Sequence, residues 1–287
     1  MTGVARRRRS ILVTGCSSGI GAHCARALAA DGWDVHATAR TDDDLAKLRD
    51  DGLAAYALDY ARPETLRDCA EAVLEATGGG LDALFNNGAY SQPGAVEDLP
   101  IDALRTQFEA NFFGWADLTN RIVAAMRRRE AGEWGRGRIV HCSSILGLVP
   151  MRWRGAYNAS KFALEGLMLT QRMELADAGI HVSMIEPGPV RSRIALNALP
   201  HALEHIDIEG SPHREAYGPA LDRLREGGSL ANPKALGPEA VHRVLVHALT
   251  ARRPRARYLV TREAKIAARM WKLLPAGAAL SLARRFS

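Results

Sequence analysis

The chain has 287 residues, of which 47% are hydrophobic, and it carries a formal net charge of +6. No apolar run approaches the roughly 20 residues that a membrane-spanning helix needs, and the run after the basic N-terminus is too short for a signal peptide, so we expect a soluble, cytoplasmic protein. The four cysteines form no C-x-x-C pair and the nine histidines no H-E-x-x-H pattern, which argues against a disulfide framework and against a metal site.

Short apolar runs alternate along the chain with patterns typical of helices. Expected strands lie at 10–15, 34–40, 54–60, 81–88, 137–144, 181–188 and 256–261. Expected helices lie at 21–32, 41–52, 63–80, about 102–129, and in the segment that carries Tyr157. This alternation predicts an α/β fold: a doubly wound parallel sheet of the Rossmann type, with about seven strands and helices on both faces.

No internal repeat or linker divides the chain, so residues 1–287 are expected to form a single Rossmann-type domain. Residues 1–9 form a basic N-terminal tail. The segment of about 194–238 breaks the alternation and is expected to be a long loop that serves as a substrate lid. The basic, amphipathic C-terminal extension, about 262–287, could lie on an anionic membrane, on a neighbouring subunit or on its own core.

A glycine-rich segment, TGCSSGIG at 14–21, stands between the first strand and the first helix. Gly15, Gly19 and Gly21 allow a sharp turn and a close approach to a ligand, and the helix N-terminus offers free N–H groups to phosphate. The second strand ends at Arg40 rather than at an acid. A guanidinium there can donate two hydrogen bonds to a 2′-phosphate, so we expect NADP(H) to be preferred and NAD(H) to be less favoured.

Tyr157 and Lys161 stand four residues apart in a helical pattern, so their side chains share one face. A nearby ammonium favours the phenolate and lowers the pKa of the phenol, which suits a general acid/base. The same spacing also occurs in surface pairs without a function. The pattern therefore needs support from the rest of the chain.

That support comes from further motifs, in order: NNGA at 86–89, Asn111, the serine pair at 143–144, YNASK at 157–161 and EPGPV at 186–190. With them, residues ~10 to 192 resemble the short-chain dehydrogenase/reductase family, in particular its steroid and retinol dehydrogenase branch and the bacterial relatives of that branch. The resemblance implies that Tyr157 is the general acid/base, that Lys161 lowers its pKa, and that Ser144 orients the substrate oxygen. Asn111 would kink its helix and hold a water that relays protons to Lys161.

The resemblance also implies a set of contacts to the dinucleotide. Lys161 and Tyr157 would take part, and the other contacts would come from Gly15, Ser17, Ser18, Gly19, Ile20, Gly21, Arg40, Asp59, Asn87, Pro187, Gly188, Val190 and Ser192. Two positions depart from the usual pattern. Gly88 and Ala89 stand in the reverse of the usual order, and Ser192 stands where the family often has threonine.

The implied function is an NADP(H)-dependent oxidoreductase that interconverts an apolar ketone or aldehyde and its alcohol by hydride transfer. One alternative is a non-catalytic NADP(H)-binding regulator. Another is a nucleic-acid or membrane-surface protein that uses the basic ends, although no helix-turn-helix accompanies them, so we expect no nucleic-acid partner. A homodimer or homotetramer would pair through the helices around 102–129 and 157–177. Leu146, Val149, Met151 and Trp153 could wall an apolar pocket or merely pack a loop.

Overall fold

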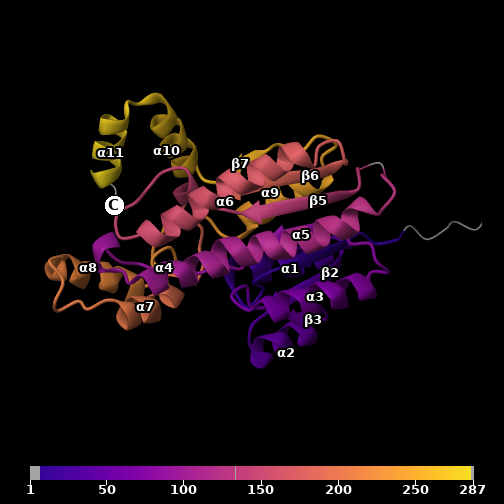
Figure 1. Ribbon diagram of the computed structural model, residues 1–287, viewed down its shortest axis with the longest axis horizontal. Helices are drawn as coiled ribbons and strands as arrows, with labels where there is room; N and C mark the ends of the chain where they lie inside the picture. The colour runs from indigo at the N-terminus through magenta and orange to yellow at the C-terminus, as the bar shows by residue number, and fades with distance from the viewer. Residues whose placement is uncertain (1–6, 133, 286–287) are drawn as a thin grey trace, which may run out of the picture.

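A computed structural model describes residues 7–132 and 134–285 of the chain. Its seven strands form one parallel sheet in the order β3-β2-β1-β4-β5-β6-β7 (Figure 1). The strands are β1 (Ser10–Val13), β2 (Asp34–Ala39), β3 (Ala54–Ala57), β4 (Ala83–Asn86), β5 (Gly137–Cys142), β6 (Ile180–Glu186) and β7 (Arg257–Leu259). The predicted fold class is therefore confirmed, and each strand lies within or next to its expected range.

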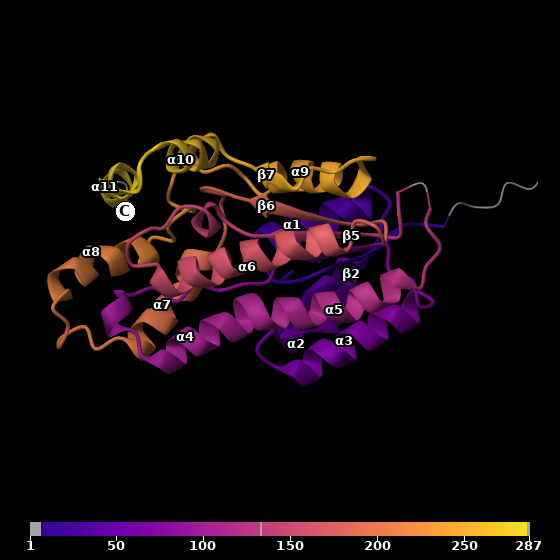
Figure 2. The same ribbon diagram turned by 45° about the horizontal axis from the view of Figure 1, so that its top comes forward.

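Helices cover both faces of the sheet. Figure 2 shows α3 and α5 below the strands and α9 at their top; α1 packs against α9, and α3 packs against α5. The helices are α1 (Gly19–Ala30), α2 (Asp42–Asp50), α3 (Pro63–Ala76), α4 (Ile101–Phe108), α5 (Gly114–Arg127), α6 (Gly155–Glu174), α7 (Ile194–His205), α8 (Arg214–Arg225), α9 (Glu239–Thr250), α10 (Arg262–Leu273) and α11 (Ala276–Arg285). In the described part of the chain, none of them is long and apolar enough to cross a membrane.

Local sequence signals explain where several helices begin. Thr41 caps α2, because its hydroxyl accepts a hydrogen bond from the backbone of Asp44 at 3.3 Å. Pro63 opens α3, where a missing N–H costs nothing. Gly78 follows α3 with a φ of 63°, a left-handed conformation that terminates helices.

The helix predicted over about 102–129 is interrupted. A short π-helix, η2 (Glu109–Phe113), separates α4 from α5 and contains Asn111. The buried amide of Asn111 donates to the carbonyl of Tyr90 at 2.9 Å and accepts from its N–H at 3.2 Å. A π-helix thus stands where we expected a kink, and Asn111 within it ties this helix pair to the chain after β4.

The prediction of a long loop over 194–238 is wrong, because α7 and α8 occupy much of it. The two helices share a second, smaller apolar cluster with Leu99 and Ala156, to which they contribute Ala198, Ala202, Tyr217 and Leu221 among others. Pro200 and Pro219 lie inside these helices and disguise their periodicity in the sequence. The segment is therefore a packed cap at one end of the sheet.

The expected N-terminal tail lies largely outside the described residues, which begin at Arg7. The expected C-terminal extension forms α10 and α11, which lie near α7 and α8 at the end of the molecule away from the N-terminus (Figure 1). All four cysteines are buried and free.

Candidate active site

A cleft of about 290 Å³ opens at the carboxyl ends of the parallel strands. It is lined by the β1–α1 loop, by the ends of β2, β4 and β5, by the start of α6 and by the segment after β6. Every predicted catalytic or cofactor-binding residue lines it except Asn111 and Gly21. A single cleft thus brings together residues that are up to 177 positions apart, from Gly15 to Ser192.

The β1–α1 loop has the shape of a phosphate cradle. Gly15 and Gly19 have φ values of 68° and 58°, which side chains rarely adopt. A Cβ on Gly15 would lie 2.8 Å from the backbone nitrogen of Gly88, and one on Gly21 would lie 2.6 Å from Nδ2 of Asn87. Ser18 is the N-cap of α1, but its side chain makes no capping bond. The first N–H groups of α1 are therefore left for an anion, and the loop fits a dinucleotide diphosphate.

Gly21 has a structural role rather than the predicted lining role. It packs against Gly15 and Asn87, so a side chain there would push the loop apart. The amide of Asn87 in turn donates to the carbonyl oxygens of Thr14 and Gly15, at 3.1 and 3.3 Å. Asn87 thereby fastens the end of β4 to the glycine loop.

The reversed order of Gly88 and Ala89 has a physical explanation. A Cβ on residue 88 would lie 3.2 Å from the ring of Tyr60 and 3.3 Å from the backbone of Gly15. The Tyr60 ring is buried there, and its hydroxyl is hydrogen-bonded to Asn86 at 2.6 Å and to Thr14 at 2.8 Å. The small residue at 88 therefore leaves room for a tyrosine at 60.

Arg40 lies at the rim of the cleft, at the end of β2. Among the described residues, none forms a hydrogen bond or ion pair with it. The nearby acids belong to α2: Asp44, for example, accepts a hydrogen bond from Thr41 at 3.0 Å. Arg40 is therefore the charged group of this strand end that faces the cleft, while Asp59, at the end of β3, lines it further along.

Tyr157 and Lys161 lie one turn apart on α6, and both are buried. Nζ of Lys161 donates to the carbonyl of Cys142 at 3.2 Å. The same nitrogen lies 4.2 Å from the ring centroid of Trp115 and 5.7 Å from that of Tyr157. The ammonium is thus held by one carbonyl and by aromatic faces.

The expectation that Lys161 lowers the pKa of Tyr157 is wrong for this structure. Burial raises the pKa of Tyr157, the neighbouring Cys142 raises it further, and the opposing effects come from a hydrogen bond with Ser144 and from the charge of Arg154. Burial also lowers the pKa of Lys161 to about 8. The reason is shared: removing either group from water disfavours its charged form. Tyr157 is therefore a neutral phenol with a proton to give.

Ser144 lies where the resemblance implies. Its hydroxyl is hydrogen-bonded to Tyr157 and accepts from the N–H of Leu146 at 3.1 Å, at the start of the short helix η3 (Ile145–Gly147). Asn111 is bonded to Tyr90 instead of lining the cleft, and no hydrogen bond joins it to Lys161 in the described part of the chain. The water relay through Asn111 stays a prediction.

Sequence reasoning missed a charged group next to Tyr157 and Lys161. Glu165 on α6 and Glu186 at the end of β6 are both buried, and Arg257 on β7 forms an ion pair of 3.0 Å with each. Burial and the neighbouring Glu165 raise the pKa of Glu186 to about 8. Arg257 thereby joins three elements next to Lys161. Only the acid at the end of the β6 pattern hinted at this group.

Other missed residues line the cleft itself. They include Tyr90, Cys142, Arg193, Ile194, Asn197 and Ser229. Ser229 is tied to the segment after β6, since its hydroxyl accepts from the backbone of Ser192 at 3.2 Å. These residues come from the cap and from strand ends, which carry no motif in the sequence.

Chemically, the cleft joins an anion cradle at one end to a serine hydroxyl, a neutral phenol and a lysine ammonium at the other. Such a set can bind a dinucleotide, hold a polar oxygen and deliver a proton to it.

Comparison with known proteins agrees with this geometry. The family model described as short chain dehydrogenase matches residues 9–201. The chain is 37% identical over 254 residues to the uncharacterized oxidoreductase YbbO of Escherichia coli, covering 88% of this chain and 86% of that one. It is 32% identical over 267 residues to human 17-beta-hydroxysteroid dehydrogenase type 1, covering 88% and 78%.

Solved structures agree as well. A short chain dehydrogenase/reductase from Burkholderia phymatum in complex with NAD has a TM-score of 0.77 at 23% identity, covering 96% of this chain and 95% of that one. One from Burkholderia cenocepacia in complex with NADP has a TM-score of 0.67 at 27% identity, covering 90% and 98%.

Proposed function

The chain belongs to the short-chain dehydrogenase family and is an NAD(P)-dependent oxidoreductase; from this premise we propose that it uses NADP(H) to interconvert an apolar ketone or aldehyde and its alcohol. The observation that carries the proposal is the meeting of Ser144, Tyr157 and Lys161 in the cleft that also contains the glycine loop. A non-catalytic regulator would need the loop but not these three side chains.

In this proposal each residue has one task. A bound nicotinamide supplies or accepts the hydride. The Ser144 hydroxyl holds the substrate oxygen, and Tyr157 gives that oxygen its proton in reduction or removes it in oxidation. The Lys161 ammonium stabilises negative charge on the phenolic oxygen after the proton has left.

The substrate class rests on the cap and on relatives. Val190 and Ile194 line the cleft, and α7, which begins at Ile194, shares an apolar cluster with α8. One relative is named for its action on 17-beta-hydroxysteroids.

The test is NADPH oxidation over a panel of aliphatic, aromatic, steroidal and retinoid carbonyls. Tight NADPH binding without turnover across that panel would favour the regulator.

Replacing Arg40 by Gln is expected to raise the KM for NADPH about 10- to 100-fold, because a hydrogen-bonded contact to a charged phosphate is lost. The KM for NADH, which lacks the 2′-phosphate, should change little. Initial rates with each cofactor measure this. Arg49→Gln on α2 is the matched control, since Arg49 lies outside the cleft. Equal effects of Arg40→Gln on both cofactors would contradict the role given to Arg40.

The rate of carbonyl reduction is expected to fall as the pH rises above about 8, the pKa to which burial lowers Lys161. Below that pH the ammonium is present, and above it the charge is lost. The pKa of Tyr157 is raised, so its proton remains available throughout this range. A profile of kcat/KM against pH measures the effect. A flat profile up to pH 10 would show that the charge of Lys161 does not matter.

Assembly and surface contacts are proposals as well. Phe113, Phe162 and Met173 are exposed on the helices expected to pair, which supports a homo-oligomer that sedimentation would reveal. On α10, Ile266, Met270 and Leu273 are exposed among basic residues, which supports a peripheral membrane contact that vesicle flotation would test.

A further inference from the structure

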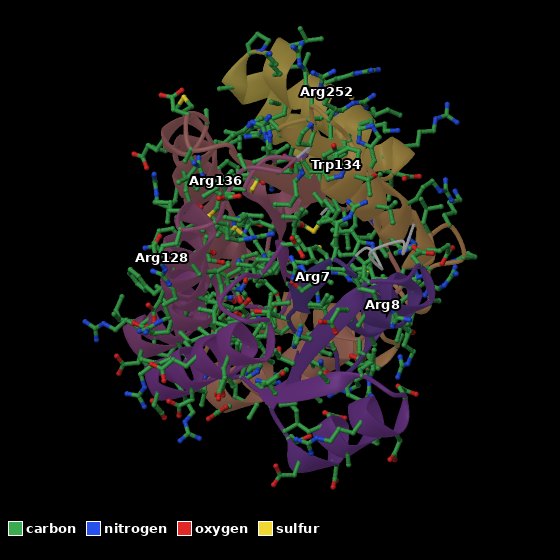
Figure 3. All side chains as sticks on the ribbon, turned by 90° about the vertical axis from the view of Figure 1, so that its right-hand side faces the viewer. Arg7, Arg8, Arg128, Trp134, Arg136 and Arg252 are labelled. Carbon is green, nitrogen blue, oxygen red and sulfur yellow. The ribbon has the colours of Figure 1, made fainter. Side chains whose placement is uncertain are left out.

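A second cavity, of about 470 Å³, lies at the end of the sheet opposite the active site. It is formed where the strands begin, by the residues before β1, the loop after α1 and the turn before β5. Figure 3 looks onto this end, where the side chains of Arg7, Arg8, Trp134 and Arg136 surround the middle of the face. The lining is strongly basic, with arginines at Arg7, Arg8, Arg9, Arg129, Arg136 and Arg138.

Acidic partners do not balance this charge. Among the described residues, three acids line the same cavity, namely Asp31, Asp82 and Glu130, so the described arginines exceed them by three. Asp82 is engaged by two arginines, because its carboxylate accepts from Arg7 at 2.9 Å and also pairs with Arg129. Asp31 faces His242, at 3.2 Å. The excess positive charge therefore belongs to the other arginines of the lining.

Arg138 is the deepest of these arginines. Only 3% of it is exposed, and its Nη2 donates to the carbonyl of Ala251 at 3.0 Å. Its Nε and Nη1 are buried without a hydrogen-bond partner among the described residues. Buried charged groups are normally paired and hydrogen-bonded, so two unused donors on a buried guanidinium call for an acceptor.

The surroundings of Arg138 carry a positive potential. Burial lowers the pKa of Arg138 to about 10. Tyr258 opposes this lowering, and the charges of Arg9 and then Arg172 add to it. Burial, Arg138 and Arg172 together lower the pKa of His181 to about 4. An anion bound here would relieve this repulsion.

Two tryptophans hold another donor in place. The guanidinium of Arg9 lies 5.1 Å from the ring centroid of Trp33 and 5.2 Å from that of Trp134. Nη1 of Arg9 and Nε1 of Trp134 are buried, and neither has a hydrogen-bond partner in the described ranges. These contacts restrict the Arg9 side chain before a ligand binds. Less conformational entropy is then lost on binding, which favours it.

We propose that this cavity binds a small phosphate-bearing anion of the diphosphate type. Arg9 and Arg138 are its inner donors, and the exposed Arg8 stands at its mouth. Arginine suits this ligand because its planar fork donates two parallel hydrogen bonds to phosphate oxygens. The ligand's phosphate comes from a soluble metabolite or from a lipid headgroup, and the experiment distinguishes the two sources.

The test is calorimetric titration of the full chain with inorganic diphosphate, in saturating NADPH so that the cofactor cleft does not compete. We expect one diphosphate per chain. Arg138→Gln should weaken its binding about 10- to 100-fold, and Arg8→Gln should weaken it less. Arg252→Gln is the matched control, an exposed arginine on the same face that does not line the cavity (Figure 3). This control should bind diphosphate as the unaltered chain does.

Absence of diphosphate binding by the unaltered chain would overturn the proposal. So would equal weakening by Arg8→Gln and Arg252→Gln, which would indicate a diffuse basic surface. If a thermal melt shows that Arg138→Gln does not fold, the comparison of Arg8→Gln with Arg252→Gln tests the proposal instead. Weaker diphosphate binding by Arg8→Gln alone would support it. Flotation with vesicles that contain phosphatidic acid separates the sources. Flotation that is lost in Arg8→Gln but kept in Arg252→Gln supports a lipid phosphate, and diphosphate binding without flotation supports a soluble one.

Discussion

Replacing Tyr157 by Phe is expected to lower kcat for NADPH-dependent carbonyl reduction by between about 100-fold and 10,000-fold, the range typical for loss of a general acid. The phenol is buried beside Ser144 and keeps its proton, because burial raises its pKa. Phenylalanine fills the same space but has no proton to give. The measurement is the rate of NADPH oxidation at a saturating carbonyl concentration, with NADPH binding followed by fluorescence.

Tyr90→Phe is the matched control for this variant. Tyr90 lines the same cleft, but its contacts with Asn111 are made by its backbone, so removing its hydroxyl leaves them in place. We expect this control to keep most of its activity. If Tyr157→Phe bound NADPH normally and still turned over at the original rate, Tyr157 would not be the proton donor.

Replacing Gly15 by Ala is expected to abolish measurable cofactor binding and to destabilise the fold. Gly15 has a φ of 68°, and a non-glycine residue held in such a conformation costs about 1–3 kcal/mol. The added Cβ would also lie 2.8 Å from the backbone nitrogen of Gly88, so the glycine loop must move away from β4. That overpacking costs about 1–3 kcal/mol more. Thermal or urea unfolding measures the stability, and NADPH titration measures the binding.

Gly78→Ala separates the backbone strain of a positive φ from the clash of the added Cβ. Gly78 has nearly the same φ, 63°, but a Cβ there meets nothing within 4 Å and lies far from the cleft. It should therefore show the backbone strain alone, with cofactor binding unchanged. Equal unfolding free energies for the two variants, or normal NADPH binding by Gly15→Ala, would show that the close approach of Gly15 to Gly88 does not shape the cradle.

Which features could be predicted from the sequence depends on how far apart in the chain the interacting residues are. The strands, the cap at Thr41, the proline that opens α3 and the glycine loop were all predictable, because each depends on residues close together in the chain. The placement of Tyr157 and Lys161 one turn apart on α6 was predictable for the same reason, since a spacing of four residues sets their geometry.

What depends on burial was not predictable. The charged neighbour of Tyr157 indicates a lowered pKa, whereas the structure raises it, because desolvation by the assembled core outweighs a single nearby charge. Likewise, the buried pair of Glu165 and Glu186 is understood only once β7 brings Arg257 to them.

The sequence by itself therefore determined the fold class, the position of the glycine loop and the side chains that we propose to react, since local patterns carry that information. Only the tertiary structure decided how α7 and α8 pack together, why Gly88 faces Tyr60, and that Arg9 and Arg138 share a basic cavity at the far end of the sheet. These outcomes depend on which distant segments meet and how much water they exclude, and both are properties of the assembled molecule.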